Sequence, residues 1–305
     1  MKRSPAYVCL AAAITVGAAG GCTAATSADR PDPGRSGPMA RELTHREQIQ
    51  LQRAEALLVK ECMAGEGFSY WVGPLPTVDD LKAGGYLVTD VDWASRHGYG
   101  GRLSERLPRL QREDPNHAYA NGLPRKERLR YDETLNGALS AGMLSVELPT
   151  GGTVRTPRHS CLTEAKERLY GDFATWFTAE KVATNVTELF VPDLVRDRRF
   201  ADAVGEWSTC MREAGHTYAD PPAIRAKLPA LTKGLSSDKA HAVEVRLAVA
   251  EARCATGTPL AATARALEKE YRGKRLGAYR DEIATYRQMS LAALARAEDI
   301  TGTTA

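Results

Sequence analysis

The chain has 305 residues, with 41 Lys and Arg against 38 Asp and Glu, so its formal net charge is only +3. Basic and acidic residues are interleaved along the sequence, whereas a protein that binds nucleic acid normally gathers its basic residues on one face. The balanced charge therefore argues against a nucleic-acid partner. Beyond the N-terminal region, no segment approaches the roughly 18 continuous apolar residues of a transmembrane helix.

Residues 1–21 have the pattern of a secretory signal peptide. Lys2 and Arg3 form a short positive segment, and an apolar stretch follows from Ala6 to Ala19. This stretch is too short to span a bilayer as a stable helix. We therefore predict that the chain is exported; an uncleaved membrane anchor is the alternative.

Ala19-Gly20-Gly21-Cys22 is similar to a bacterial lipobox, in which the cysteine becomes the first mature residue and carries lipid. The usual residue at the Ala19 position is Leu, so ordinary signal cleavage nearby stays open. Residues 22–40 are rich in Ala, Ser, Asp, Gly and Pro and cannot bury enough surface to fold. We predict lipidation at Cys22 and a flexible tether over 22–40, which anchor the protein to the outer face of the cytoplasmic membrane.

The folded part is predicted to begin with a helix. Thr44 and Glu47 form a capping box, with Thr at the N-cap and Glu three residues later. Apolar residues then recur at helical spacing: Ile49, Leu51, Ala54, Leu57 and Leu58. Gly67 ends the pattern, so Cys62 is expected in the last turns of this helix.

A thirteen-residue frame, C-M-x3-G-x2-Y-x3-P, occurs at residues 62–74 and again at 210–222. The second copy also follows a predicted helix, over Asp197–Ala214. We interpret the frame as a helix end: the cysteine tethers it, the methionine fills a gap and the glycine permits a left-handed turn. The tyrosine is expected to fold back and the proline to keep the exit extended. The repeat predicts two related helical modules, 41–192 and 193–305.

The first module carries a long insertion, residues 71–157. It is rich in turn-forming residues, and a short helix is expected from near Asp90 to Gly98. A second helix is predicted over Pro124–Asn136. A small β-hairpin follows, with strands at Leu144–Leu148 and Thr153–Arg155. Long irregular segments on a rigid scaffold often carry binding sites, so the insertion is the first place to look for function.

Helical patterns resume after the insertion. One runs from Ser160 through Phe177, and another covers Ser237–Ala255. From Thr258 a long C-terminal helical pattern runs to about Glu298, with Gly273 and Gly277 as the positions where it is expected to bend. Taken together, the elements predict a mainly α fold.

Four cysteines lie in the mature chain, at Cys62, Cys161, Cys210 and Cys254. An even set in an exported chain implies disulfides, and four cysteines allow three connectivities. The repeat favours Cys62–Cys161 and Cys210–Cys254, one bridge per module. Structural zinc would need close pairs such as C-x2-C, and a redox site would need C-x-x-C. Both sites would use this same spacing, which does not occur among the four cysteines, so we expect no metal and no cofactor.

Aromatic residues concentrate in and beside the insertion. The candidate binding surface comprises Tyr70, Trp71, Trp93, His97 and Tyr99. Exposed rings of this kind stack on sugars or peptides, whereas buried ones would form a small core beneath the loop.

Carboxylates suggest an alternative, enzymatic function. Acidic side chains that could pair for glycan cleavage are Glu66, Asp79, Asp80, Asp90 and Asp92. Nothing in the sequence sets their separation, and neither G-x-S-x-G nor H-E-x-x-H occurs. We therefore assign no catalytic residue, and a cell-wall glycan or peptide hydrolase remains the alternative to a binding protein.

Several segments together resemble exported lipoproteins of actinobacteria. These are the lipobox-like start, the repeated C-M-x3-G-x2-Y frame, Asp92–Gly100, Cys161–Asp172 and Ala252-Arg253-Cys254. The resemblance covers most of the mature chain and implies its location and architecture, but it brings no catalytic residues. We expect a binding or accessory role in the envelope, with a transporter, another envelope protein or a cell-wall polymer as partner. A purely structural spacer is a further alternative.

Overall fold

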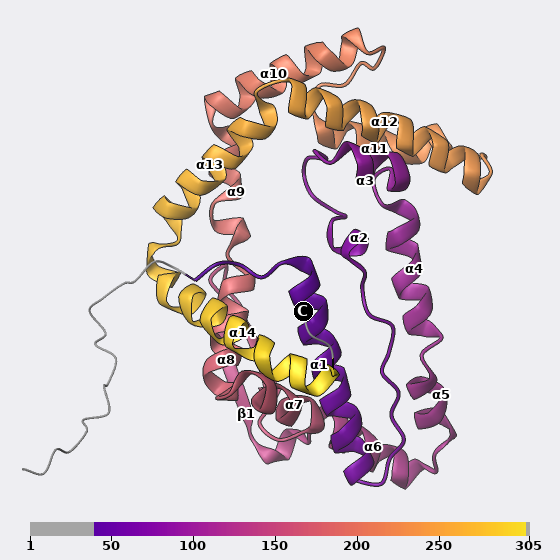
Figure 1. Cartoon of the computed structure of the whole chain (residues 1–305), viewed down its shortest axis with the longest axis vertical. Coiled ribbons are helices and arrows are strands. Elements are labelled where there is room, and N and C mark those ends of the chain that lie inside the picture. Colours follow the sequence, from indigo (N-terminus) through magenta and orange to yellow (C-terminus); the bar gives the residue numbers. More distant parts are fainter. Residues whose placement is uncertain (1–39, 303–305) are drawn as a thin grey trace, which may run out of the picture. The chain divides into compact units, whose positions relative to one another are not determined.

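The computed structural model describes residues 40–302 (Figure 1). The predicted signal peptide, the lipidation site Cys22 and the tether up to residue 39 lie outside the described residues. Helices make up 71% of the structure and a single two-stranded antiparallel hairpin is present in the described part, which confirms the mainly α prediction. Among residues 40–302, no helix combines the length and the apolar character that crossing a membrane requires.

The elements of the first half are α1 (His45–Gly65), α2 (Val78–Leu81), α3 (Val91–His97), α4 (Gly101–Arg112), α5 (Pro115–Gly122), α6 (Arg125–Asn136), the 3-10 turn η1 (Leu139–Ala141), β1 (Met143–Glu147) and β2 (Thr153–Pro157). Those of the second half are α7 (Cys161–Tyr170), α8 (Phe173–Thr184), η2 (Thr187–Leu189), α9 (Val191–Arg196), α10 (Arg198–Glu213), α11 (Pro221–Thr232), α12 (Ser237–Gly257), α13 (Leu260–Arg275), η3 (Gly277–Tyr279) and α14 (Arg280–Thr301).

The repeated frame forms the same helix end twice. After α1, Gly67 has a φ of 83° and the Phe68 N–H donates to the Met63 carbonyl at 2.9 Å. After α10, Gly215 has a φ of 84° and the corresponding bond from residue 216 to residue 211 is 2.8 Å long. Both methionines of the frame are fully buried. The frame is therefore a helix terminator, as predicted, and the left-handed glycine explains its spacing.

Both disulfides follow the predicted pairing. Cys62 is bonded to Cys161, and Cys210 is bonded to Cys254. The partner cysteines, however, sit at different places in their helices. Cys161 is the first residue of α7, whereas Cys254 lies in the last turn of α12. The structural repeat thus covers the first helix of each module and its end, and stops before the helix that receives the bridge.

Two large apolar cores organise the described residues, beside two smaller clusters. The first core surrounds Leu58, Met63 and Leu169 and joins α1, α7, α8 and the hairpin. The second core surrounds Trp207 and Ile224 and joins α10, α11, α12 and α13. Their composition follows from the apolar stripes of amphipathic helices.

The apolar cores combine elements from both predicted modules, 41–192 and 193–305. Helix α14 belongs to the second module in sequence, but its Ala293 and Ala297 are fully buried in the first core, where α14 runs beside α1 and α8 (Figure 1). In the opposite direction, α3 of the insertion packs on α12 through Ala94, Ala248 and Ala252. Each module thus contributes an element to the packing of the other.

Two expected helices are interrupted. The C-terminal helical pattern to Glu298 forms two helices, because η3, which begins at the expected bend position Gly277, separates α13 from α14. The pattern from Ser160 through Phe177 is likewise two helices. Gly171, with a φ of 93°, ends α7, and the Asp172 side chain accepts a hydrogen bond at the start of α8. The other expected insertion elements, two helices and the hairpin, are present.

Candidate functional site

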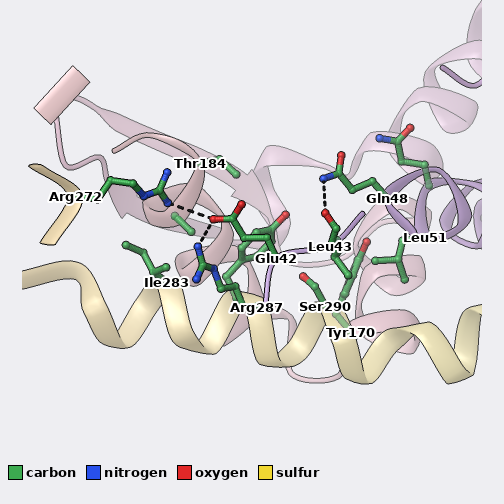
Figure 2. A pocket seen from close by; sticks show the side chains of 13 residues that line it. Glu42, Leu43, Gln48, Leu51, Tyr170, Thr184, Arg272, Ile283, Arg287 and Ser290 are labelled. Carbon is green, nitrogen blue, oxygen red and sulfur yellow. Dashed lines mark hydrogen bonds and ion pairs between the residues drawn. The ribbon is translucent and has the colours of Figure 1, made fainter. Parts of the chain in front are cut away.

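A cavity of about 390 Å³ opens between the start of α1 and the C-terminal helices (Figure 2). Its walls come from the segment before α1 and from α1, α7, α8, α13 and α14. Ligand pockets typically measure roughly 300–1,000 Å³, so this one suits a small ligand. The site depends on the bend at η3, which carries α14 back toward α1.

One end of the cavity is cationic. Arg272 of α13 and Arg287 of α14 both reach the same carboxylate oxygen, Oε1 of Glu42, in the segment before α1 (Figure 2). The Arg272 Nη2 lies 3.5 Å from that oxygen, and Arg287 also hydrogen-bonds to it through Nη2. The Arg287 Nη1 donates to the Ala40 carbonyl at 3.4 Å. Two arginines from separate helices thus converge on one carboxylate.

The burial of these partners is unequal. The Arg287 side chain is 17% exposed and that of Arg272 is 32% exposed, whereas the Glu42 side chain is 66% exposed. Two arginine side chains that are largely shielded from solvent therefore share a carboxylate that is mostly exposed to it. A guanidinium in this state favours a carboxylate partner that fits it with full hydrogen bonding.

Contacts outside the cavity hold Arg272 in place. Its guanidinium lies 5.6 Å from the centre of the Phe190 ring. Its Nη1 donates to Glu268, one turn earlier on α13, at 3.4 Å. Because these contacts do not involve Glu42, the position of Arg272 is prepared without it.

The remainder of the cavity is apolar with neutral polar groups. Leu51 and Ile283 supply buried apolar surface. Burial raises the pKa of both Tyr170 and Tyr286, so both hydroxyls stay protonated at neutral pH. The Tyr170 ring is fixed by stacking on Trp176, with ring centres 4.4 Å apart. The arrangement suits a ligand with an anionic group and an apolar body.

Trp71 and Tyr70, two residues of the candidate binding surface, lie beside α5. The backbone of Trp71 is clamped by Asn116, which accepts its N–H at 2.9 Å and donates to its carbonyl at 2.8 Å. The Trp71 ring contacts Tyr119 edge-on and is 42% exposed. Tyr70 is partly buried against the first core.

Trp93, His97 and Tyr99 lie elsewhere, where the insertion meets α12. Trp93 is only 3% exposed, and its ring packs against His97. Tyr99 is part of the second core and donates its hydroxyl to Glu251 at 2.8 Å. The five residues thus form two separate clusters. Trp93, His97 and Tyr99 are packed beneath the insertion rather than displayed on a surface.

The five carboxylates of the hydrolase alternative occupy structural positions. Asp80 completes the capping box of α2 and pairs with an arginine of α4. Asp90 caps α3 and pairs with a lysine, and Asp79 lies 3.1 Å from the His97 imidazole. Glu66 and Asp92 are exposed at helix ends. Within residues 40–302, no group of three or more His, Cys, Asp or Glu side chains is placed to hold a metal ion.

Glu251 of α12, which the sequence did not single out, anchors the insertion. It is fully buried and accepts hydrogen bonds from the Val88 N–H at 2.9 Å, the Tyr99 hydroxyl and the Arg225 guanidinium at 3.1 Å. Burial raises the pKa of this carboxyl. Glu244, two turns earlier, accepts from the backbone N–H groups of residues 99 and 101. The sequence feature that could have identified Glu251 is its place on the apolar face of α12, because a charged residue is rarely buried without a partner.

Comparison of the chain with protein-family models, with curated proteins and with solved structures finds no match. The candidate site therefore rests on its own geometry. The observation that carries the most chemical information is the convergence of Arg272 and Arg287 on a carboxylate at the mouth of a partly apolar cavity.

Proposed function

We propose that the protein is a binding protein of the cell envelope, lipidated at Cys22 and displayed on the outer face of the cytoplasmic membrane. Two observations support this location. Residues 22–40 have the composition of a tether. The described part holds two disulfides, which persist in oxidising compartments outside the cytosol.

The ligand that we propose is a small organic carboxylate of about dipeptide size, with an apolar or aromatic body. Its carboxylate would lie between Arg272 and Arg287, which already hold a carboxylate in this structure. Its body would lie on Leu51 and Ile283, within reach of protonated tyrosine hydroxyls. A transporter or another envelope protein that receives the ligand is the partner that this role implies.

Calorimetric titration of the purified full chain tests the proposed ligand class. The probe is benzoylglycine, and its uncharged amide is the matched control. A hydrogen bond to a charged group is worth about 1.5–3 kcal/mol, so the amide should bind at least about tenfold more weakly. Arg287→Gln should abolish binding of the acid, whereas Arg280→Gln, an exposed change on the same helix, should leave it unchanged. Equal binding of acid and amide would contradict the proposal.

The anchor is tested separately in the native host. Cys22→Ser should release the protein from the membrane fraction into the medium. Retention of this variant in the membrane fraction after residues 1–21 have been cleaved from it, as intact mass shows, would rule out lipid at Cys22 as the anchor.

A further inference from the structure

The segment Ala40–Leu43, here called the strap, runs across the cationic end of the cavity and supplies Glu42 to it. We propose that the strap is a built-in competitor: the Glu42 carboxylate occupies the position that the ligand carboxylate takes, and the ligand must displace it. This inference rests on the proposed function and adds its regulation.

Glu42 is held in a way that permits its release. Its side chain is two-thirds exposed, and ion pairs with such an exposed partner contribute little to stability. The neighbouring strap contacts are long, with 3.4 Å for the bond from Arg287 to the Ala40 carbonyl and 3.4 Å for that from Gln48 to the Leu43 carbonyl. Both of these contacts are made by backbone carbonyls, so neither requires the Glu42 side chain to stay in the cavity mouth.

The residues on either side of Glu42 are fixed to α1 instead. Arg41 forms a two-pronged pair with Glu47, at 2.8 and 2.5 Å. Thr44 shares the same Glu47 carboxylate through the capping box. Displacement therefore requires only that the Glu42 side chain turn toward solvent, while the backbone beside it stays attached to the helix.

Competition within one chain has a defined thermodynamic effect. A tethered group acts at a high effective concentration, so it lowers the apparent affinity of any free carboxylate for the two arginines. The coupling is reciprocal, and ligand binding must expel Glu42 to the same extent that Glu42 opposes binding. Ligand binding thereby changes the position of the Glu42 side chain, which lies in the segment that continues into the predicted tether.

The test compares two glutamates of similar exposure that pair with the same arginine. Glu42 lines the cavity, whereas Glu268 pairs with Arg272 from outside it, and their side chains are 66% and 50% exposed. Glu42→Gln should tighten binding of benzoylglycine to the full chain by about fivefold, which corresponds to about 1 kcal/mol. Glu268→Gln removes the same charge without freeing the position and should change the affinity by less than about twofold. The benzoylglycine amide should not gain from either change.

Each failure has a separate meaning. An equal gain in both variants would show a general field effect and would overturn the strap as competitor. An unchanged affinity in Glu42→Gln, with binding still abolished by Arg287→Gln, would also overturn it but would leave the proposed ligand class intact. Absence of binding in both the unmodified chain and Glu42→Gln would overturn the proposed function as well. Thermal unfolding of each variant checks that the fold is retained.

Discussion

Replacing Glu251 by alanine should weaken the attachment of the insertion to α12. In the structure this one carboxylate is fully buried and satisfies three donors, from Val88, Tyr99 and Arg225. Truncation removes the shared acceptor and leaves all three donors without it. The perturbation therefore acts on a polar network rather than on a single bond.

The expected cost follows from what is left behind. A buried donor without an acceptor costs about 1–3 kcal/mol, and removing one partner of a buried ion pair typically costs about 3–5 kcal/mol. The Arg225 side chain is 28% exposed and can partly recover water, which reduces its share. We expect Glu251→Ala to lower the free energy of unfolding by about 3–5 kcal/mol. Glu251→Gln, which keeps the shape and one acceptor, should cost less.

Urea unfolding followed by circular dichroism measures this difference, with Asp238→Ala as control. Asp238 is on the same helix with its side chain 94% exposed, and its one ion pair, with Arg102, is at the surface, so its loss should cost less than about 1 kcal/mol. Hydrogen exchange adds a local measure, because the Val88 amide should lose protection in Glu251→Ala before the first core does. A loss of less than about 1 kcal/mol in Glu251→Ala would refute the network as the anchor of the insertion.

Three further outcomes are expected. Gly215→Ala should destabilise the fold by about 1–2 kcal/mol because Gly215, just after α10, has a φ of 84°. Gly205→Ala, in the interior of α10, should instead stabilise the fold by about 0.5–1 kcal/mol. Both sites have open space for a methyl group, so equal shifts of the two variants in thermal melts would contradict the backbone argument. Replacing Cys210 and Cys254 by serine should cost about 4 kcal/mol for a separation of 44 residues, and an unchanged urea midpoint would contradict this. The hydrogen bond from Arg41 lowers the pKa of the Glu47 carboxyl from 4.5 to about 2. The stabilisation by ionised Glu47 is therefore complete above pH 4.5 and is lost as the pH falls toward 2. Glu47→Gln should make the unfolding free energy depend less steeply on acid pH, and parallel curves for the two proteins would contradict this.

Local features of the fold were predictable because short-range chemistry decides them. The capping box at Thr44 and the glycine terminators at Gly67 and Gly215 depend only on neighbouring residues, and all three are present. The disulfide pairing was also within reach, since the repeat relates Cys62 to Cys210 and leaves one partner for each.

The candidate site was only partly predictable. Gly273 and Gly277 indicated where the C-terminal helical pattern bends, but the pattern does not give the direction in which α14 returns. Arg272 and Arg287 are 15 positions apart, so a continuous helix would separate them by roughly 22 Å at 1.5 Å per residue. The interruption at η3 brings both guanidinium groups to one oxygen of Glu42 instead. The direction in which α14 returns is seen only in its packing on α1, a tertiary contact that spacing along the chain does not contain.

The aromatic residues of the insertion show a second limit. Composition identified Trp71 and Trp93 as equal candidates, but one is 42% exposed and the other 3% exposed. The difference arises because Trp93 lies on a helix that packs against α12, whereas Trp71 lies in an irregular segment whose backbone is held by Asn116. Exposure depends on contacts distant in sequence, which spacing along the chain does not contain.

The place of α14 in the first core has a consequence for biosynthesis. Leu58 and Ala297 share that core although they lie near opposite ends of the described chain, so the core is completed only when the last helix has been synthesised. Both cysteines of the Cys62–Cys161 bridge, which joins α1 to α7, precede α14 in the chain. We expect this covalent link to hold the two helices together as a partly open groove, with apolar surface exposed until α14 arrives to cover it.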